Sequence, residues 1–146
     1  MGASDDAGTL DCSEIVLRGL RERHARPPFP PRAACRPEAC LLGEADLDRG
    51  RLRDEYLSIY RESLIDSYEA LYETHLPISR ALASLHCGRA RTLGLDAREE
   101  GEPGNEAHAG IHGLPHPEDG PAEADAAEEL ALALALVARI CHRRGG

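Results

Sequence analysis

The sequence predicts an α+β fold in which a long C-terminal helix and one or two shorter helices pack on a small mixed sheet. Three observations support this class. Leucines repeat at helical spacing near the C-terminus, several segments in the second half alternate apolar with polar or small residues, and short segments between them carry helix-capping residues. The length of 146 residues suits one domain with a modest core.

The N-terminal part is predicted to be an appendage to this domain. The Asp-X-X-Glu pattern at residues 11–14 is a capping box, so a helix is expected over residues 11–24. Residues 26–32 contain four prolines and favour an extended, stiff linker. We therefore expect residues 1–32 to be flexible or helical with a proline-rich linker, and residues 33–146 to form a single α+β domain.

The central part is predicted to alternate between strands and short helices. Ser67 or Asp66 can cap a helix that Pro77 ends, and Gly94 suits the left-handed residue that follows a helix. The expected elements are a strand near 38–44, a loop at 46–54, a strand at 57–61, a helix at 67–76, a strand at 80–86, a helix at 87–93, and strands at 95–100 and 106–114.

The final helix is predicted to supply most of the apolar area that the sheet buries. Pro121 sits where a first-turn proline belongs, and acidic residues follow it near the positive end of the helix dipole. The expected helix covers residues 122–142. Its apolar face is formed by Leu130, Leu132, Leu134, Leu136, Val137, Ile140 and Cys141.

Charge and composition narrow the classes of function. The formal net charge is −9, and arginines are interleaved with acidic residues rather than gathered on one basic face, which argues against nucleic-acid binding. The chain has no lysine, so lysine Schiff-base chemistry is excluded. No P-loop, G-X-S-X-G or G-X-G-X-X-G motif occurs, so no cofactor is expected.

The cysteines and the apolar runs indicate a cytoplasmic protein. Five scattered cysteines without a C-X-X-C pair favour reduced thiols, and the first residues are acidic where a secretory leader would be basic. The longest apolar run, residues 130–138, is about half of a membrane span, so no membrane association is expected.

The stretch from Asn105 to His116 carries the candidate chemistry. In a strand, His108 and His112 point to the same face about 13 Å apart, which is too far for one metal ion unless the strand bends at Gly110. Metal binding by these two histidines, with His116 or Cys87 as further ligands, is one interpretation.

A second interpretation makes His108 a general base, since neutral imidazole suits proton transfer near pH 7. Asn105, or an acid such as Asp96 or Glu99, would orient it. The third interpretation is structural. The Asn105 side chain would bond a backbone N–H two residues on, and His108 would cap a carbonyl through one ring nitrogen.

Arginine and tyrosine side chains form a second group of candidates. Arg61 flanks a predicted core strand and is expected either to bind an anion or to pair with Glu62, Glu69 or Glu73. Four of the five aromatic residues lie close together in the sequence, and they are expected to be core residues with hydroxyls at the rim or to form a protein-binding patch. These tyrosines are Tyr56, Tyr60, Tyr68 and Tyr72.

The order of features at residues 57–115, with three motifs among them, resembles a family of small, uncharacterised bacterial hypothetical proteins. The motifs are Leu-Ser-Ile-Tyr-Arg at 57–61, Arg-Thr-Leu-Gly-Leu at 91–95 and Pro-Gly-Asn-Glu-Ala-His-Ala at 103–109. The last resembles an Asn-Pro-Ala-His-Ala signature, from which this chain departs at Glu106. The resemblance covers under half of the chain. It implies a fold shared among relatives and a motif worth testing, without an established activity.

Together these features predict a small cytosolic binding or accessory protein that acts through contact with a protein partner. The absence of a cofactor motif, the acidic composition, the proline-rich arm and the tyrosine cluster support it. An alternative is a small hydrolase or nuclease centred on His108, with Asn105, His112 and Arg61 as helpers. A further alternative is a metal-binding protein that uses the histidines of residues 108–116.

Overall fold

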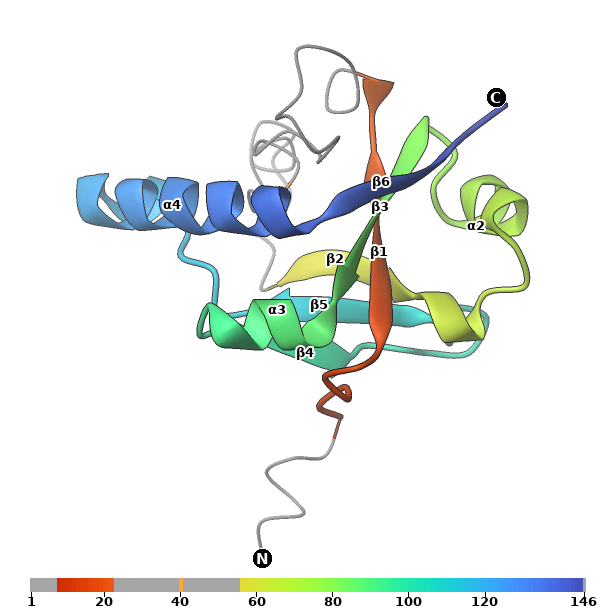
Figure 1. Cartoon of the computed structure of the whole chain (residues 1–146), viewed down its shortest axis with the longest axis horizontal. Coiled ribbons are helices and arrows are strands. Elements are labelled where there is room, and N and C mark those ends of the chain that lie inside the picture. The colour runs from red at the N-terminus through yellow and green to blue at the C-terminus, as the bar shows by residue number, and fades with distance from the viewer. Residues whose placement is uncertain (1–7, 23–39, 41–55, 146) are drawn as a thin grey trace, which may run out of the picture.

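The computed structural model describes residues 8–22, 40 and 56–145, which form a six-stranded sheet with helices on both faces (Figure 1). The strand order is β4-β5-β2-β1-β3-β6. The strands are β1 (Ile15–Leu20), β2 (Leu57–Arg61), β3 (Ala81–His86), β4 (Asp96–Glu99), β5 (His108–His112) and β6 (Arg139–Arg143). The helices are α2 (Tyr68–Thr74), α3 (Cys87–Thr92) and α4 (Pro121–Val137), with short 3-10 turns η3 (Glu62–Leu64) and η4 (Pro117–Asp119).

This architecture confirms the α+β class with a long helix near the C-terminus. The strand directions are more uniform than expected, because all five pairings between the described strands are antiparallel. Antiparallel neighbours account for the alternation seen in the sequence, since each strand can present one face to an apolar core and the other to polar surroundings.

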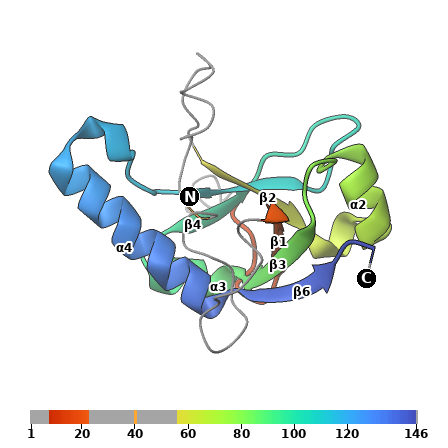
Figure 2. The same cartoon turned by 90° about the horizontal axis from the view of Figure 1, so that it is seen from above.

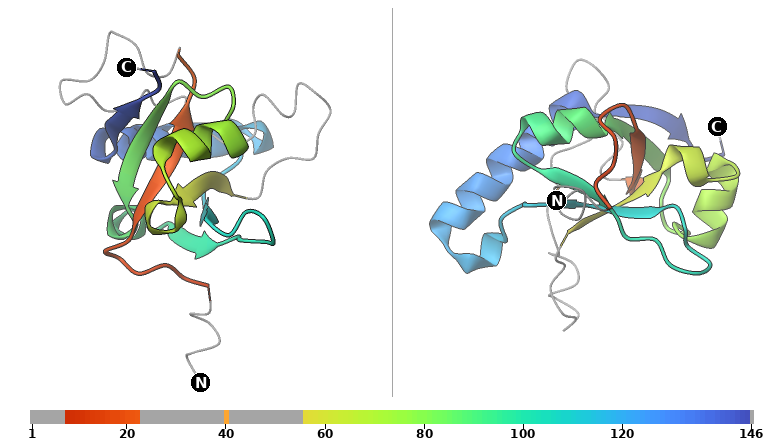
Figure 3. Two further views of the ribbon diagram at one scale, coloured as in Figure 1. Left: turned by 90° about the vertical axis from the view of Figure 1, so that its right-hand side faces the viewer. Right: turned by 90° about the horizontal axis from the view of Figure 1, so that it is seen from below.

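The sheet separates two apolar cores. Figure 2 shows α4 and α2 at opposite ends of the molecule. Helices α3 and α4 cover one face, where the larger core includes Val16, Ile59 and Leu134. Helix α2 covers part of the other face through Leu71 and Tyr72, and the left view of Figure 3 looks onto this helix. Adjacent residues of one strand, such as Val16 and Leu17, therefore enter different cores.

The helix expected over residues 11–24 is wrong, because β1 occupies the middle of the sheet. Val16, Leu17 and Leu20 are at most 1% exposed, and a strand buried on both faces reads as a continuous apolar run. Residues 15–20 thus belong to the sheet and not to an appendage. The proline-rich tract and the predicted strand near 38–44 lie outside the described residues, apart from Cys40, which joins the larger core.

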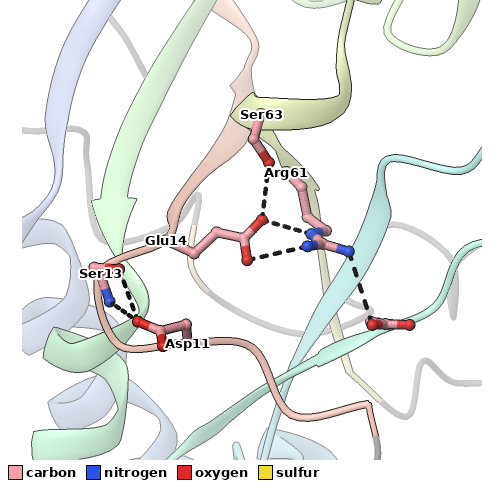
Figure 4. Close-up of polar contacts among 6 residues, drawn as sticks. Asp11, Ser13, Glu14, Arg61 and Ser63 are labelled. Atoms are coloured by element: carbon pink, nitrogen blue, oxygen red, sulfur yellow. Dashed lines mark hydrogen bonds and ion pairs between the residues drawn. The ribbon is translucent and has the colours of Figure 1, made fainter.

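The capping pattern at residues 11–14 has a different use in the structure. The Asp11 carboxylate accepts hydrogen bonds from the Ser13 backbone N–H at 2.9 Å and from its hydroxyl at 2.7 Å. These bonds lower the pKa of Asp11. They brace a turn that leads into β1, while Glu14 bonds to Arg61 (Figure 4).

The middle of the chain confirms the predicted order of elements from β2 to β5. Ser67 caps α2, and its hydroxyl oxygen accepts a hydrogen bond from the Ala70 N–H at 3.0 Å. Gly94 follows α3 with a φ of 84°, and its N–H donates to the Arg91 carbonyl at 2.9 Å. The sequence was sufficient to predict these helix ends because Ser67 and Gly94 themselves make the hydrogen bonds that begin or end the helices.

The C-terminal helix is shorter than expected. Helix α4 ends at Val137, Ala138 is extended, and β6 then pairs with β3 as an edge strand. The expected apolar face is also wrong in part, because Leu132 is 48% and Leu136 is 53% exposed. The buried side chains of α4 are Ala127, Ala131, Leu134 and Ala135, so the helix approaches the sheet mainly through small residues.

Strand β6 is fixed to α2 by a cluster of rings. A hydrogen bond of 3.0 Å joins the Tyr72 hydroxyl to His142 Nδ1, and the Tyr68 ring lies 4.8 Å from the His142 ring. The hydrogen bond from the Tyr68 hydroxyl to the Glu62 carboxylate raises the pKa of Tyr68 to about 12. Burial raises the pKa of Tyr72 to about 12 as well.

These two tyrosines predict a loss of stability at alkaline pH. A tyrosine hydroxyl in an unfolded chain has a pKa of about 10, so the folded state holds these protons more tightly. Their contribution is complete below pH 10 and is lost as the pH rises through about 12. We expect the urea midpoint to fall between pH 10 and 11. It should fall less steeply when Tyr68 and Tyr72 are both replaced by phenylalanine, and equal slopes would contradict this assignment.

Candidate functional site

Strands β2 and β5 bring tyrosine and histidine side chains to one face of the sheet. Tyr60 lies opposite His108 in the pairing of β2 with β5. Tyr56 comes just before β2, four residues from Tyr60, and alternate residues of a strand point to the same face. His112 follows on β5. We call Tyr56, Tyr60, His108 and His112 the tyrosine–histidine face. It lies on the same side of the sheet as α2, and Tyr60 packs in the smaller core with Leu71 and Tyr72 of α2.

The rings of this face form a contiguous layer. The Tyr56 ring lies between His108 and His112, at centroid distances of 5.8 and 5.0 Å. The Tyr60 ring lies 5.3 Å from His108 and stacks on His75 at 5.5 Å. Gly110 makes room for Tyr56, because a Cβ atom at Gly110 would lie 2.2 Å from its Cδ1 atom. The glycine between the two histidines is thus needed for packing.

His108 has a partner at each ring nitrogen. Its Nδ1 lies 3.2 Å from the carbonyl oxygen of Glu100, and its Nε2 lies 2.8 Å from Oγ of Ser58. A carbonyl oxygen can only accept, so the neutral ring carries its proton on Nδ1 and leaves the Nε2 lone pair toward Ser58. The carbonyl contact agrees with the structural interpretation of this histidine.

His112 is oriented by the side chain of the same glutamate. Its Nε2 lies 2.7 Å from Glu100 Oε2, and the two side chains are 31% and 27% exposed. The acids that were expected to orient His108 were wrong, because both pair with arginines. Asp96 pairs with Arg98 at 2.7 Å, and Glu99 lies 3.8 Å from Arg61.

The metal interpretation gains no support from the geometry. The Tyr56 ring lies between His108 and His112, and His116 faces Glu118 at 3.5 Å. Cys87 lies in the core on the other face, where burial raises its pKa to about 11. In residues 8–22, 40 and 56–145, no three or more His, Cys, Asp or Glu side chains form a group that could hold a metal ion.

Asn105 braces the β4–β5 turn through its backbone. Its N–H donates to the Glu102 carbonyl at 2.8 Å, and its own carbonyl accepts from the His108 N–H at 3.2 Å. The side chain was expected to bond a backbone N–H two residues on, which is wrong. Among the described residues, Oδ1 of Asn105 is buried without a hydrogen-bond partner, while the amide contacts the Tyr60 hydroxyl.

Arg61 is committed to an ion pair away from His108. Its Nε lies 2.6 Å from Glu14 Oε1, a second nitrogen lies 3.1 Å from Oε2, and Ser63 donates to the same carboxylate at 3.1 Å (Figure 4). The bidentate pair raises the pKa of Arg61. Its expected partners were wrong because Glu14 is supplied by the turn before β1. A helper role toward His108 is not supported.

Ser58 is the functional candidate that the sequence alone did not reveal. It lies within the Leu-Ser-Ile-Tyr-Arg motif, but its pairing with His108 depends on the alignment of β2 with β5. The alternating pattern of β2 could have indicated that Ser58 faces away from the main core. No local signal specifies the partner strand or its register.

Comparison with protein-family models, with curated protein sequences and with solved structures gave no match. The family resemblance drawn from the three sequence motifs therefore stays a prediction. Within the described part of the chain, no helix combines the length and apolar character needed to cross a membrane.

Proposed function

We propose that the chain is a binding protein that contacts a basic protein partner. The contact surface is the tyrosine–histidine face together with the acidic turn, which we define as Glu100, Glu102 and Glu106. The single observation that supports this proposal most is the layer of rings that neighbouring side chains already hold in place, in which Tyr56, His108 and His112 are partly exposed around the buried Tyr60.

The layer has the properties of a protein contact surface. Aromatic side chains contribute large contact areas at interfaces, and their polar atoms tolerate both water and a partner. Glu100 orients both histidines, and Gly110 seats Tyr56, so little side-chain freedom is lost when a partner binds. Tyr56, His108 and His112 thus resemble a preorganised contact surface at the margin of the smaller core.

The charge of the chain favours a basic partner. The formal net charge is −9, and Glu102 and Glu106 are exposed in the turn that leads into β5. Complementary charge accelerates encounter and suppresses wrong partners, and the effect weakens as salt increases. The same charge disfavours nucleic acid, which requires a basic surface.

Affinity capture with matched variants tests this proposal. The bait is the full chain, and lysate of the source organism is applied at about 150 mM and about 500 mM salt. We expect a basic protein to be retained at the lower salt by the wild type and by Leu132→Ala, whose side chain lies on α4. The Tyr56→Ala/His112→Gln variant should lose it. Capture of the same proteins by all three baits would overturn the proposal.

A further inference from the structure

We propose that Ser58 is a nucleophile activated by His108, and that this pair hydrolyses small carboxylic esters with good leaving groups. The inference concerns a chemical activity, goes beyond the binding proposal and does not rest on it. It retains the predicted role of His108 as a base but replaces the expected helpers with a residue on the neighbouring strand.

The distance between nucleophile and base is that of a direct hydrogen bond. Ser58 Oγ lies 2.8 Å from His108 Nε2, within the range in which a general base can remove a proton from a hydroxyl. The two residues come from adjacent strands in the interior of the sheet, which hold such geometry more accurately than loops do.

The carbonyl of Glu100 supplies the third part of the arrangement. Because it can only accept, it selects the His108 tautomer with the proton on Nδ1, and Nε2 is then free to accept the Ser58 proton. It also stabilises the imidazolium that forms after proton transfer, since Nδ1–H remains hydrogen-bonded. In hydrolases of the serine–histidine type a carboxylate performs this orienting role.

The backbone and neighbouring rings hold Ser58 in place. The Ser58 carbonyl accepts a hydrogen bond from Arg18 at 2.9 Å, and the register places Ser58 opposite Gly110, over which the Tyr56 ring lies. Ser58 is half-buried. Tyr56 and Tyr60 are the next side chains on the same face of the strand, so an aryl or short acyl group would contact aromatic surface.

The reaction uses water as its only co-reactant. Ser58 Oγ attacks the ester carbonyl carbon while His108 Nε2 takes the hydroxyl proton, which gives a tetrahedral oxyanion. Its collapse breaks the bond to the alcohol oxygen, and that leaving group receives the proton from His108. Water then attacks the acyl-serine with His108 again as base, and the carboxylic acid departs as Ser58 regains its proton. No oxidant or metal is needed.

The test combines covalent labelling with ester hydrolysis. The purified full chain is treated with a fluorophosphonate, mapped by peptide mass spectrometry, and assayed with p-nitrophenyl acetate. We expect label on Ser58, and no label on this peptide in Ser58→Ala. Replacement of His108 by alanine should lower hydrolysis by about 10²-fold or more. The exposed residues Ser63 and His86 provide matched controls, since Ser63→Ala and His86→Gln should retain both signals.

Imidazole rescue separates a chemical from a purely structural role of His108. Added imidazole should restore labelling of His108→Ala if the ring acts as a base, whereas a lost brace would not be repaired by free imidazole. Urea unfolding of each variant shows whether it is folded under the assay conditions. Absence of label on Ser58 in the wild type, or equal hydrolysis by Ser58→Ala and the wild type, would overturn the proposal, even if partner capture succeeds.

Discussion

Replacement of Leu134 by alanine is expected to lower the free energy of unfolding by about 2–5 kcal/mol. Leu134 is 1% exposed and projects from α4 into the larger core. It lines a cavity of about 20 Å³ together with Val16, Ile59 and Ile111 of the sheet. The substitution removes Cγ and both Cδ atoms and so enlarges this cavity. The other buried side chains of α4 are alanines, which are too short to fill it.

The same helix provides the control for this substitution. Leu136→Ala removes the same atoms from a side chain that is 53% exposed, so a change within about 0.5 kcal/mol is expected. Urea denaturation of both variants, with unchanged slopes, measures the two effects. If Leu134→Ala also costs less than about 0.5 kcal/mol, α4 does not contribute to the core as described.

Gly110→Ala is expected to destabilise the protein by about 1–3 kcal/mol, although alanine is ordinarily the better residue in a strand. The added Cβ would lie 2.2 Å from Cδ1, 2.5 Å from Cγ and 3.0 Å from Cβ of Tyr56. Movement of the ring end cannot relieve a clash at Cγ and Cβ. The backbone gain of about 0.5–1 kcal/mol is therefore outweighed by displacement of Tyr56 from β5.

A double-mutant cycle shows whether Tyr56 is the cause. In the background of Tyr56→Ala the clash is absent, so Gly110→Ala should be neutral or stabilising. The coupling energy obtained from urea unfolding of the four proteins should be at least about 1 kcal/mol. A coupling energy near zero would mean that Gly110 is required for some reason other than the ring above it.

The part of the fold predicted correctly from the sequence is the part whose signals are local. The Ser67 side chain makes its own capping bond, and Gly94 adopts its own left-handed conformation. Alternation in β4 and β5 reflects their burial, as Ala97, Ala109 and Ile111 are buried while their neighbours are more exposed, except for Gly110. Such features need no information about distant segments.

The errors fall where distant segments decide the structure. Residues 15–20 form a strand because β2 and β3 offer two edges to pair with. The capping pattern at residues 11–14 begins no helix. Asp11 accepts a hydrogen bond from Ser13 instead, and Glu14 accepts one from Arg61. Residues 139–143 continue the helical apolar period, yet they leave the helix because β3 has a free edge beside them.

The same distinction between local and distant information explains why only part of the candidate site was predicted. His108, His112 and Asn105 were identified from one stretch of sequence, and all three lie at or beside the tyrosine–histidine face. Ser58 and the Glu100 carbonyl were not identified, because each reaches His108 only through strand pairing. Arg61 was selected because it is charged, and in the structure its guanidinium forms an ion pair with Glu14.

The central position of β1 has a consequence for synthesis on the ribosome. Of the described strands β1 is synthesised before the others, and β3, which pairs with it from Leu20–Ala81 to Ile15–His86, is synthesised much later. Until β3 is made, the β1 edge that pairs with it has no partner, and the side chains of Val16, Leu17 and Leu20 lack the cores that bury them. Such a segment can associate with other chains. Products that terminate before Ala81 are thus expected to aggregate, which centrifugation of stalled or truncated translation products would detect.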